Sequence, residues 1–445
     1  MKLTTEIKLA INKIIKKLSG EQYNYCSATT RELGLDSNKI PDTLTIHRDI
    51  LIRDISGFDY IELITTKEVR DMIYDLSHSV VGKSKIYCYP DDIVCYMDNL
   101  ILYVINSKSS LFRAYFNNDN LHEFNCDIDS IFKLTLQKIR KEILHKRRFS
   151  FPLHMVGLSK GFKLSSFARI KVANESLLSP EYQKAYLFGR HSIFNALLEI
   201  DVDVRASYNM GCYLAQRAAR IISGIVNMHA TQYNNDLPPF ILSEDKAPPV
   251  FDFLLHSFCN SEEIPSYKRS FFHNNELKYF WLQLEDRVGD RYFLILMNIV
   301  KLSFRPLDEK KRVCDIIINS ILWFNDALKD GGKHSRIVKV VTSLECLVNF
   351  NNENDKLKDS FIKRIVALTP SKHPFHDCVE SQSNDIYLAR STIVHGSIYR
   401  RELGFCPLIY ARSVIIFTVI NYDKYGLEKT SFNKSLPKYI DSIES

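Results

Sequence analysis

The sequence predicts an α+β multi-domain protein in which a mixed α/β N-terminal region with β-rich modules precedes an all-α helical bundle. The chain has 445 residues, more than one hydrophobic core usually supports. Short β-branched and aromatic segments gather between residues 80 and 173, and the sequence becomes almost entirely helical from Pro306 onward. We therefore expect three domains: an N-terminal α/β region over 1–125, a β-rich and helical middle module over 126–305, and a helical bundle over 306–445.

The N-terminal region is expected to begin with an amphipathic helix over residues 2–18, where isoleucines recur at helical spacing between lysines. Over residues 80–116 the composition changes. The segments "SKIYCYP", "DIVCYMD", "LILYVIN" and "LFRAYF" are β-branched and aromatic, which is typical of antiparallel strands. The stretch "VVGKSK" resembles the end of a phosphate-binding loop. That loop needs a glycine where Ser77 stands, so we interpret the match as chance.

The middle region combines helices, strands and a loop. A helix expected over 128–148 ends in the basic cluster "HKRRF". The basic segment 138–149 could contact RNA phosphates. Cations near a helix C-terminus also complement the helix dipole, and we favour this solvated face. The other expected elements are strands within 150–173, helices at 206–229 and 276–301, and a loop at 231–250.

Glycine and proline divide the C-terminal region into helices. Gly331 and Gly332 end the first helix. Pro370 and Pro374 separate the third from the fourth, and Gly396 follows the fourth. A glycine directly after a helix accepts the left-handed backbone conformation that commonly ends it. The expected helices lie near 308–329, 334–349, 355–369, 382–395 and 406–424, and together they predict a compact bundle.

Charge, cysteines and hydropathy limit the environment and the partners. Formal net charge is +7, which is compatible with a nucleic-acid partner and is also common among soluble proteins. The ten cysteines form no CxxC pair, and lysines interrupt the N-terminus, so we expect reduced thiols in the cytoplasm. The longest apolar runs are shorter than the ~20 residues that cross a bilayer, so we expect no membrane association.

One segment contains possible metal ligands. "HPFHDC" supplies His373, His376 and Cys378, but a closed zinc site needs a fourth ligand, and no second cluster with metal spacing lies nearby in sequence. A polar loop between helices is the simpler interpretation. We therefore expect no metal and no cofactor.

Arg390 and His395 stand five positions apart, with Gly396 directly after the histidine. Spacing alone is a weak sign, because Arg140 and His145 have the same spacing. Residues five apart diverge by about 140° around a helix axis. The two side chains can converge if Gly396 lets the chain bend at the last turn, or if two copies of the helix meet across a symmetric dimer.

These two residue types suit metal-free cleavage of RNA. The reaction needs a base for the 2′-hydroxyl, a proton for the leaving 5′-oxygen, and positive charge on the phosphorane. Histidine titrates near neutrality, and arginine presents a planar fork of donors to phosphate oxygens. The attacking hydroxyl belongs to the substrate, so such a site is specific for RNA.

The C-terminal region resembles a known family. In order, "GGKHSRIVKVVTSLECLVNF" (331–350), "LKDSFIKRIVALT" (357–369) and "YLARSTIVHGS" (387–397) resemble the HEPN domain, specifically its Apea-like group, over about 306–445. The resemblance implies a metal-independent endoribonuclease that forms a homodimer through this domain. It also implies RNA as substrate, with tRNA among the candidates, and a role as a toxin or as an effector of antiviral (anti-phage) defence. A phage-derived or partner-protein trigger would activate it.

Carried over residue by residue, the resemblance implies Arg390 and His395 as the catalytic pair, with Ser391 as a polar neighbour. Glu345 would orient Arg390 or another residue of the cleft, and a surface or capping role is the alternative. Some relatives place a tyrosine where this chain has Ser397, which argues against regulation through modification of such a tyrosine. The candidates for binding RNA at the rim are Arg400 and Arg401.

Other functions remain open for the C-terminal region. The main alternative is a HEPN module that binds RNA or a partner protein without cutting, with Arg390 and His395 as a phosphate anchor. A purely structural dimerisation domain is the third. Residues 1–305 resemble the long N-terminal regions that precede HEPN domains in multi-domain defence proteins, where they would sense a trigger or select RNA.

Overall fold

The structure is a computed structural model of the chain. It forms two compact units, one of Met1–Lys146 with Val204–Cys212 and the other of Arg147–Asp203 with Tyr213–Ser445. The sheet strands of the second unit and the helical range 306–445 therefore share a unit, and the division into three domains stays a prediction. The structure describes residues 4–32, 51–52, 61–62, 67–84, 86–106, 128–155, 160–172, 196–231, 240–242, 253–259, 262–268, 274–305, 312–350, 357–430 and 432–443.

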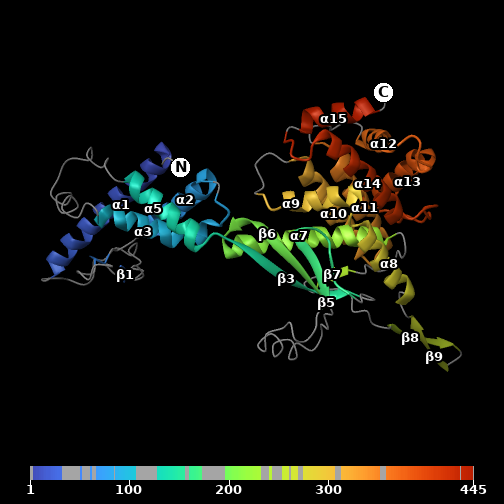
Figure 1. The fold of residues 1–445 in the computed structure, drawn as a ribbon, viewed down its shortest axis with the longest axis horizontal. Helices are drawn as coiled ribbons and strands as arrows, with labels where there is room; N and C mark the ends of the chain where they lie inside the picture. Colours follow the sequence, from blue (N-terminus) through green and yellow to red (C-terminus); the bar gives the residue numbers. More distant parts are fainter. Residues whose placement is uncertain are drawn as a thin grey trace. The chain divides into compact units, whose positions relative to one another are not determined.

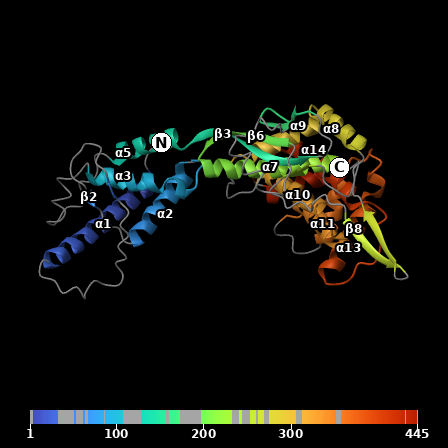
Figure 2. The ribbon, with the colours of Figure 1, turned by 90° about the horizontal axis from the view of Figure 1, so that it is seen from below.

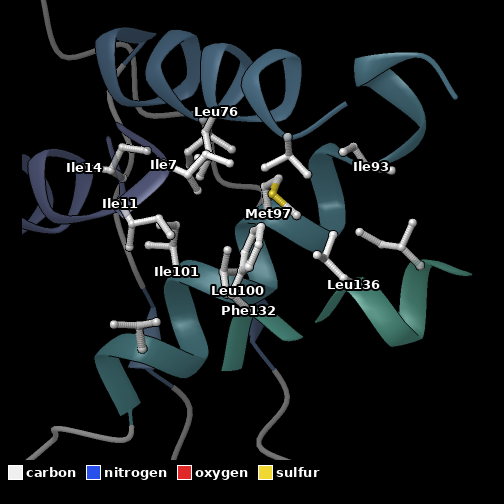
Figure 3. Close-up of a cluster of buried hydrophobic side chains, with 14 of the residues drawn as sticks. Ile7, Ile11, Ile14, Leu76, Ile93, Met97, Leu100, Ile101, Phe132 and Leu136 are labelled. Carbon is white, nitrogen blue, oxygen red and sulfur yellow. The ribbon is translucent and has the colours of Figure 1, made fainter. Parts of the chain in front are cut away.

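The described part of the first unit is mainly helical. Its helices share one apolar core and are α1 (Thr5–Glu32), α2 (Lys67–Ser84), α3 (Val94–Asn106) and α5 (Ile128–Glu142). In Figure 3, Ile7 and Ile11 of α1 face Leu76 of α2, Leu100 of α3 and Phe132 of α5. The expected N-terminal helix is confirmed and extends beyond residue 18. The two-residue strands β1 (Leu51–Ile52) and β2 (Ile61–Glu62) pair antiparallel.

The prediction of strands between residues 86 and 106 is wrong. A short 3-10 helix, η1 (Pro90–Asp92), leads into α3. Met97, Leu100, Ile101 and Val104 are buried at helical spacing, so packing of one helix face overrides the strand preference of the surrounding residues. The segment "LFRAYF" lies outside the described residues. "VVGKSK" begins within the last turns of α2, a helix rather than a phosphate-binding loop.

A five-stranded sheet is the main β element of the chain. Its order is β4–β5–β6–β3–β7. Strands β4 with β5, β5 with β6, and β3 with β7 pair antiparallel. This confirms the strands expected within 150–173. The bounds are β3 (His145–Met155), β4 (Phe162–Lys163), β5 (Ala168–Val172), β6 (Ala196–Ala206) and β7 (Phe240–Leu242).

The basic cluster "HKRRF" lies on a strand, contrary to the prediction of a helix end. Helix α5 ends at Glu142, and β3 begins at His145. Arg148 donates from Nη2 to Asp201 Oδ2 of β6 at 3.0 Å, a cross-strand partner that the end of a helix would not provide. The dipole explanation therefore does not apply to Arg148.

Helix α7 (Tyr208–Ala230) confirms the helix expected at 206–229, and Figure 1 shows it running along the sheet. It packs closely on α10 (Val313–Leu328) at Gly224, where an added Cβ would lie 2.6 Å from Ile321 Cγ2. One turn later, Asn227 Nδ2 donates to Asn325 Oδ1 at 3.0 Å. Only a glycine permits this backbone approach without moving the neighbouring helix.

The helix expected over 276–301 is two helices. Helices α8 (Asn274–Arg287) and α9 (Arg291–Leu302) are separated at Gly289. Strand β7 lies inside the segment expected to be a loop. A separate ribbon, β8 (Phe253–Cys259) with β9 (Glu262–Lys268), pairs antiparallel, and Figure 2 shows it as two long arrows.

The five helices expected in the C-terminal region are all present, and a sixth follows them. They are α10, α11 (Lys333–Val348), α12 (Leu357–Leu368), α13 (His376–Val394), α14 (Pro407–Tyr425) and the unexpected α15 (Phe432–Ile443). Helix α14 carries buried tyrosines. Tyr422 donates to the Leu347 carbonyl at 2.6 Å, and Tyr410 shares a hydrogen bond of 2.6 Å with Ser383.

A buried charged group fixes the beginning of α10. Arg312 and Asp315 are 4% and 5% exposed. Arg312 donates from Nε and Nη2 to the two carboxylate oxygens of Asp315, both at 3.1 Å. Arg217 of α7 approaches the same carboxylate, with Nη2 3.7 Å from Oδ1. Arg312, which directly precedes α10, and Arg217 of α7 therefore share one buried aspartate.

The first turn of α10 also binds the segment after α14. The N–H of Val313 donates to the carbonyl of Lys429 at 3.0 Å, and the N–H of Cys314 donates to that of Leu427 at 2.9 Å. The first N–H groups of a helix lack partners within the helix. The chain that follows α14 supplies them here.

No helix within the described ranges combines the length and the apolar character that crossing a membrane requires.

Candidate functional site

Arg390 and Glu345 lie together between two packed helices. Arg390 belongs to α13 and Glu345 to α11, and Nη2 of the arginine is 3.5 Å from Oε2 of the glutamate. The two side chains are 30% and 18% exposed. The structure thus brings together two residues that the sequence placed on separate helices. The Nε atom of Arg390 is buried and has no hydrogen-bond partner among the described residues.

Tyr387 completes this group and was not predicted from the sequence. It lies one turn before Arg390 on the same face of α13, and its interaction with the Glu345 carboxylate lowers the pKa of that carboxyl. The guanidinium carbon of Arg390 is 6.0 Å from the centre of the Tyr387 ring. Tyr387 also packs on Phe361 of α12, with ring centres 5.1 Å apart. The i, i+3 spacing of Tyr387 and Arg390 was the signal available in the sequence.

Burial shapes the charges of this group. Burial raises the pKa of the Glu345 carboxyl, while the positive charge of Arg390 and the hydrogen bond from Tyr387 act in the opposite direction. Burial, together with the negative charge of Glu345, raises the pKa of Tyr387. The Tyr387 hydroxyl therefore stays protonated at neutral pH, so it is able to donate to the glutamate that faces Arg390.

His395 is the residue at which α13 ends. Helix α13 stops at Val394, and Gly396 adopts a left-handed φ of 78°. The N–H of Gly396 donates to the Ile393 carbonyl, and the N–H of Ser397 donates to the Thr392 carbonyl, both at 3.0 Å. This is the Schellman arrangement, which turns the chain away from the helix axis. The prediction that glycine ends this helix is confirmed, and His395 is exposed.

Within one chain, Arg390 and His395 do not contact each other. No hydrogen bond or ion pair joins them in the part of the chain that the structure describes, and the partner of Arg390 is Glu345. The pattern in Arg140 and His145 has a different setting: Arg140 lies in the last turn of α5, and His145 begins β3. Of these two pairs, only Arg390 and His395 combine an arginine that is paired with a carboxylate and an exposed histidine at a helix end.

The other predicted site residues lie around this helix end. Ser391 is half-buried on α13, and Arg400 and Arg401 are exposed beyond it. The segment that carries the two arginines is tied to the start of α11. His334 is hydrogen-bonded to the Tyr399 carbonyl at 3.2 Å, and Lys333 pairs with Glu402 at 3.6 Å.

The segment "HPFHDC" is not wholly a loop. Helix α13 begins at His376, six residues earlier than expected, so His376 and Cys378 lie in its first turn. The ring of His373 accepts a hydrogen bond from the N–H of Phe375 at 3.1 Å, and Cys378 Sγ donates to the Phe375 carbonyl. Among the described residues, no group of three or more His, Cys, Asp or Glu side chains could hold a metal ion.

Two further arginines, one in segment 331–350 and one in segment 357–369, make contacts that stabilise the fold. Arg336 donates from Nε and Nη2 to the Asp330 carbonyl, which holds the turn before α11. Arg364 donates to the Val348 carbonyl at the end of α11 at 2.6 Å and lies over the ring of Phe350. These contacts fix both ends of the helix that carries Glu345.

Comparison with known proteins gives no relative for this chain. No protein-family model matches the sequence, no curated protein is significantly similar to it, and no solved structure matches the fold.

Proposed function

We propose that the C-terminal helices form a metal-independent endoribonuclease of the HEPN type. The arrangement of Arg390 carries the proposal: Glu345 pairs with its guanidinium, the ring of Tyr387 lies 6.0 Å from the guanidinium carbon, and His395 is exposed five residues later, where Gly396 ends the helix. A fixed arginine and an exposed imidazole are the two groups that RNA cleavage by its own 2′-hydroxyl requires.

In the proposed reaction a histidine takes the proton of the 2′-hydroxyl, and the oxygen attacks the adjacent phosphorus. The bond from phosphorus to the 5′-oxygen breaks, and that oxygen receives a proton. The products are a 2′,3′-cyclic phosphate and a 5′-hydroxyl. Arg390 stabilises the charge on the phosphorane oxygens. One imidazole cannot serve both ends of the reaction at once, so two copies of the chain supply His395 twice.

Exposed apolar side chains near His395 support this dimer. Leu388 and Val394 of α13 are 45% and 51% exposed, and Ile398 just beyond it is 69% exposed. We infer that a second copy of the chain covers these side chains. A second copy packed there would bring its own helix end toward Arg390 of the first.

Cleavage of RNA that contains a single 2′-deoxy position tests the proposed chemistry. We expect the protein, in the presence of a metal chelator, to cut an RNA oligonucleotide at a mapped position. It should leave the same sequence intact there when the nucleotide 5′ to the cut lacks its 2′-hydroxyl, because the nucleophile is then missing. End analysis by mass spectrometry should find a cyclic phosphate. RNA binding without any cut would favour the non-catalytic alternative.

Protonation of Glu345 should lower activity at acidic pH. Because burial raises the pKa of this carboxyl, it becomes neutral at a higher pH than an exposed glutamate, and Arg390 then loses its anionic partner. We expect Glu345→Gln to lower kcat by about 10- to 100-fold through misplacement of Arg390. The variant should also remove the part of the acidic decline in the kcat profile that belongs to the carboxylate.

The matched control for Glu345→Gln is Glu380→Gln, at an exposed glutamate on α13. We expect it to retain the wild-type rate and pH profile. An acidic limb identical in wild type and Glu345→Gln would contradict the role given to this carboxylate.

The biological role in the proposal follows from the resemblance. A ribonuclease of this kind would act as a toxin or as an effector of antiviral defence, held inactive until a phage-derived or partner-protein trigger releases it. RNA decay in cells that express the chain, with fragment ends mapped, would show whether tRNA or RNA in general is cut.

A further inference from the structure

The sheet of the second unit has an apolar face and a charged face. On the apolar face, Phe162 of β4 packs against Trp281 of α8, with ring centres 6.5 Å apart, and Ile170 and Leu198 are buried. Side chains alternate along a strand. The opposite face of β5 therefore carries Arg169 and Lys171, and that of β4 carries Lys163.

Two cations face each other on neighbouring strands of this charged face. Lys163 and Arg169 are direct partners in the register of β4 and β5, and the next partner of Arg169 is Glu199 on β6. Like charges directly opposite one another on a sheet destabilise it. Lys163 is exposed, and no ion pair to it is found within the described ranges. This position therefore carries a charge that the fold does not need.

The carboxylates on this face are fewer than its cations. Glu199 is paired with Arg169, with Lys171 at 2.7 Å, and with Arg148 at 3.9 Å. Burial opposes the ionisation of Glu199, yet the hydrogen bonds from Lys171 and Arg169 keep its pKa below the usual value. Asp201 is the next carboxylate on β6 and is paired with Arg148. Asp203 follows at the next alternate position and is paired with Lys301 of α9 at 3.8 Å, so it adds no negative charge that this lysine does not balance.

The resulting surface is a row of positive side chains held in place by shared carboxylates. Arg148, Lys163, Arg169 and Lys171 stand against Glu199 and Asp201, so cations are in excess. Arg148 and Lys171 remain 48% and 40% exposed although they are paired. Their donors can reach a ligand without a change in the sheet.

We propose that this charged sheet face binds the phosphate backbone of RNA. Successive phosphates of a single strand offer a line of negative charges. The cations of β4 and β5 lie on neighbouring strands about 5 Å apart, and Arg148 of β3 lies beyond β6, so positive groups stand on both sides of the strand that carries the carboxylates. The choice of RNA rests on the proposed function, but binding at this face does not require cleavage. The face would hold substrate RNA by its backbone and add affinity independent of base sequence.

The substitution Lys163→Glu separates this proposal from a purely structural role. A glutamate at this position would face Arg169 directly and form a favourable cross-strand pair, so the melting temperature should stay constant or rise. A phosphate-binding face would lose one contact and gain a repulsive charge. We expect the affinity for a fluorescent oligouridylate to fall by about tenfold at about 50 mM salt, since each contact contributes about 0.7 to the salt slope.

The measurement uses the full-length chain with His395→Ala, so that the RNA stays intact, and fluorescence anisotropy over a range of salt. Lys438→Glu, an equal charge change at an exposed lysine of α15, is the control and should leave the affinity unchanged. Equal affinities of Lys163→Glu and the parent would overturn the proposal. So would competition by polyglutamate as strong as that by unlabelled RNA, which would indicate an acidic protein partner.

Binding and cleavage can fail separately. Binding that depends on Lys163 without any cutting by the chain with His395 intact would leave the sheet face standing and refute the proposed ribonuclease. If the chain cuts RNA and Lys163→Glu leaves its RNA affinity unchanged, the proposed ribonuclease is supported and the role of the sheet face is refuted. Absence of RNA binding at low salt would overturn the role of the face.

Discussion

Replacing His395 with alanine should lower the rate of RNA cleavage by about 10²- to 10⁴-fold, the usual contribution of a general acid–base group. Arg390→Ala should cost about 10²- to 10³-fold, because the developing charge on the phosphorane loses its fixed donor. Single-turnover cleavage of a labelled RNA, in the presence of a chelator, measures both. Expression of the wild type should slow growth, and expression of either variant should not.

The control for His395→Ala is His373→Ala, an exposed histidine in the turn before α13. It should cut RNA at the wild-type rate, and all three variants should elute at the same size as the wild type. Equal cleavage by wild type and His395→Ala would refute the catalytic role. A strict requirement for added metal would direct attention to His373, His376 and Cys378.

Replacing Asp315 with asparagine should destabilise the second unit by about 3–5 kcal/mol. Asp315 is the shared partner of Arg312 and Arg217, and it is 5% exposed. A neutral side chain of the same shape leaves two positive charges close together, with Arg312 4% exposed. Thermal unfolding followed by circular dichroism should show a loss of about 10 °C in the transition that melts the helices.

Two further variants identify the cause of that loss. Asp326→Asn changes an exposed aspartate of α10 and should alter stability by less than about 0.5 kcal/mol. Arg312→Met combined with Asp315→Leu removes both charges of the closest pair and should cost less than Asp315→Asn alone. A shift below about 1 kcal/mol for Asp315→Asn would show that water reaches the group and screens it.

The helices of the C-terminal region could be predicted because their ends are local signals. Gly396 follows α13 with a left-handed φ, and Pro370 lies between α12 and α13. Gly331 and Gly332 lie between α10 and α11 as expected, but α10 already ends at Leu328, and Gly332 precedes the first turn of α11 instead of ending α10. Such residues act through their own backbone preferences, whatever the rest of the fold does. Helix α15 was missed because it contains Pro437, which normally argues against a helix.

The errors in the N-terminal half arise where tertiary packing decides the structure. The valines, isoleucines and tyrosines of α3 favour strands locally, but its apolar residues at helical spacing find partners on α1 and α5. The cluster "HKRRF" has the charge of a helix end, and its partner Asp201 lies far along the chain on β6. A contact of that kind cannot be inferred from either segment alone.

In the candidate site, too, the features that depend on local sequence could be predicted, and those that depend on tertiary packing could not. The order of the motif residues placed Arg390 and His395 on one helix and Glu345 on another, and the ion pair between Arg390 and Glu345 agrees with one of the two roles considered for Glu345. Tyr387 was missed because its hydroxyl interacts with Glu345 only when α11 packs on α13. The roles of these residues in catalysis stay predictions until the variants are measured.

The cap on α10 has a consequence for how the protein is made. The N–H groups of Val313 and Cys314 donate to the carbonyls of Lys429 and Leu427, respectively, which the ribosome adds much later. The first turn of α10 therefore cannot be completed before residue 429 has been made, and the helices between these two segments include those that pair Arg390 with Glu345. A nascent chain that ends before Leu427 would leave both N–H groups without these partners, so this group of helices should fold late and cooperatively.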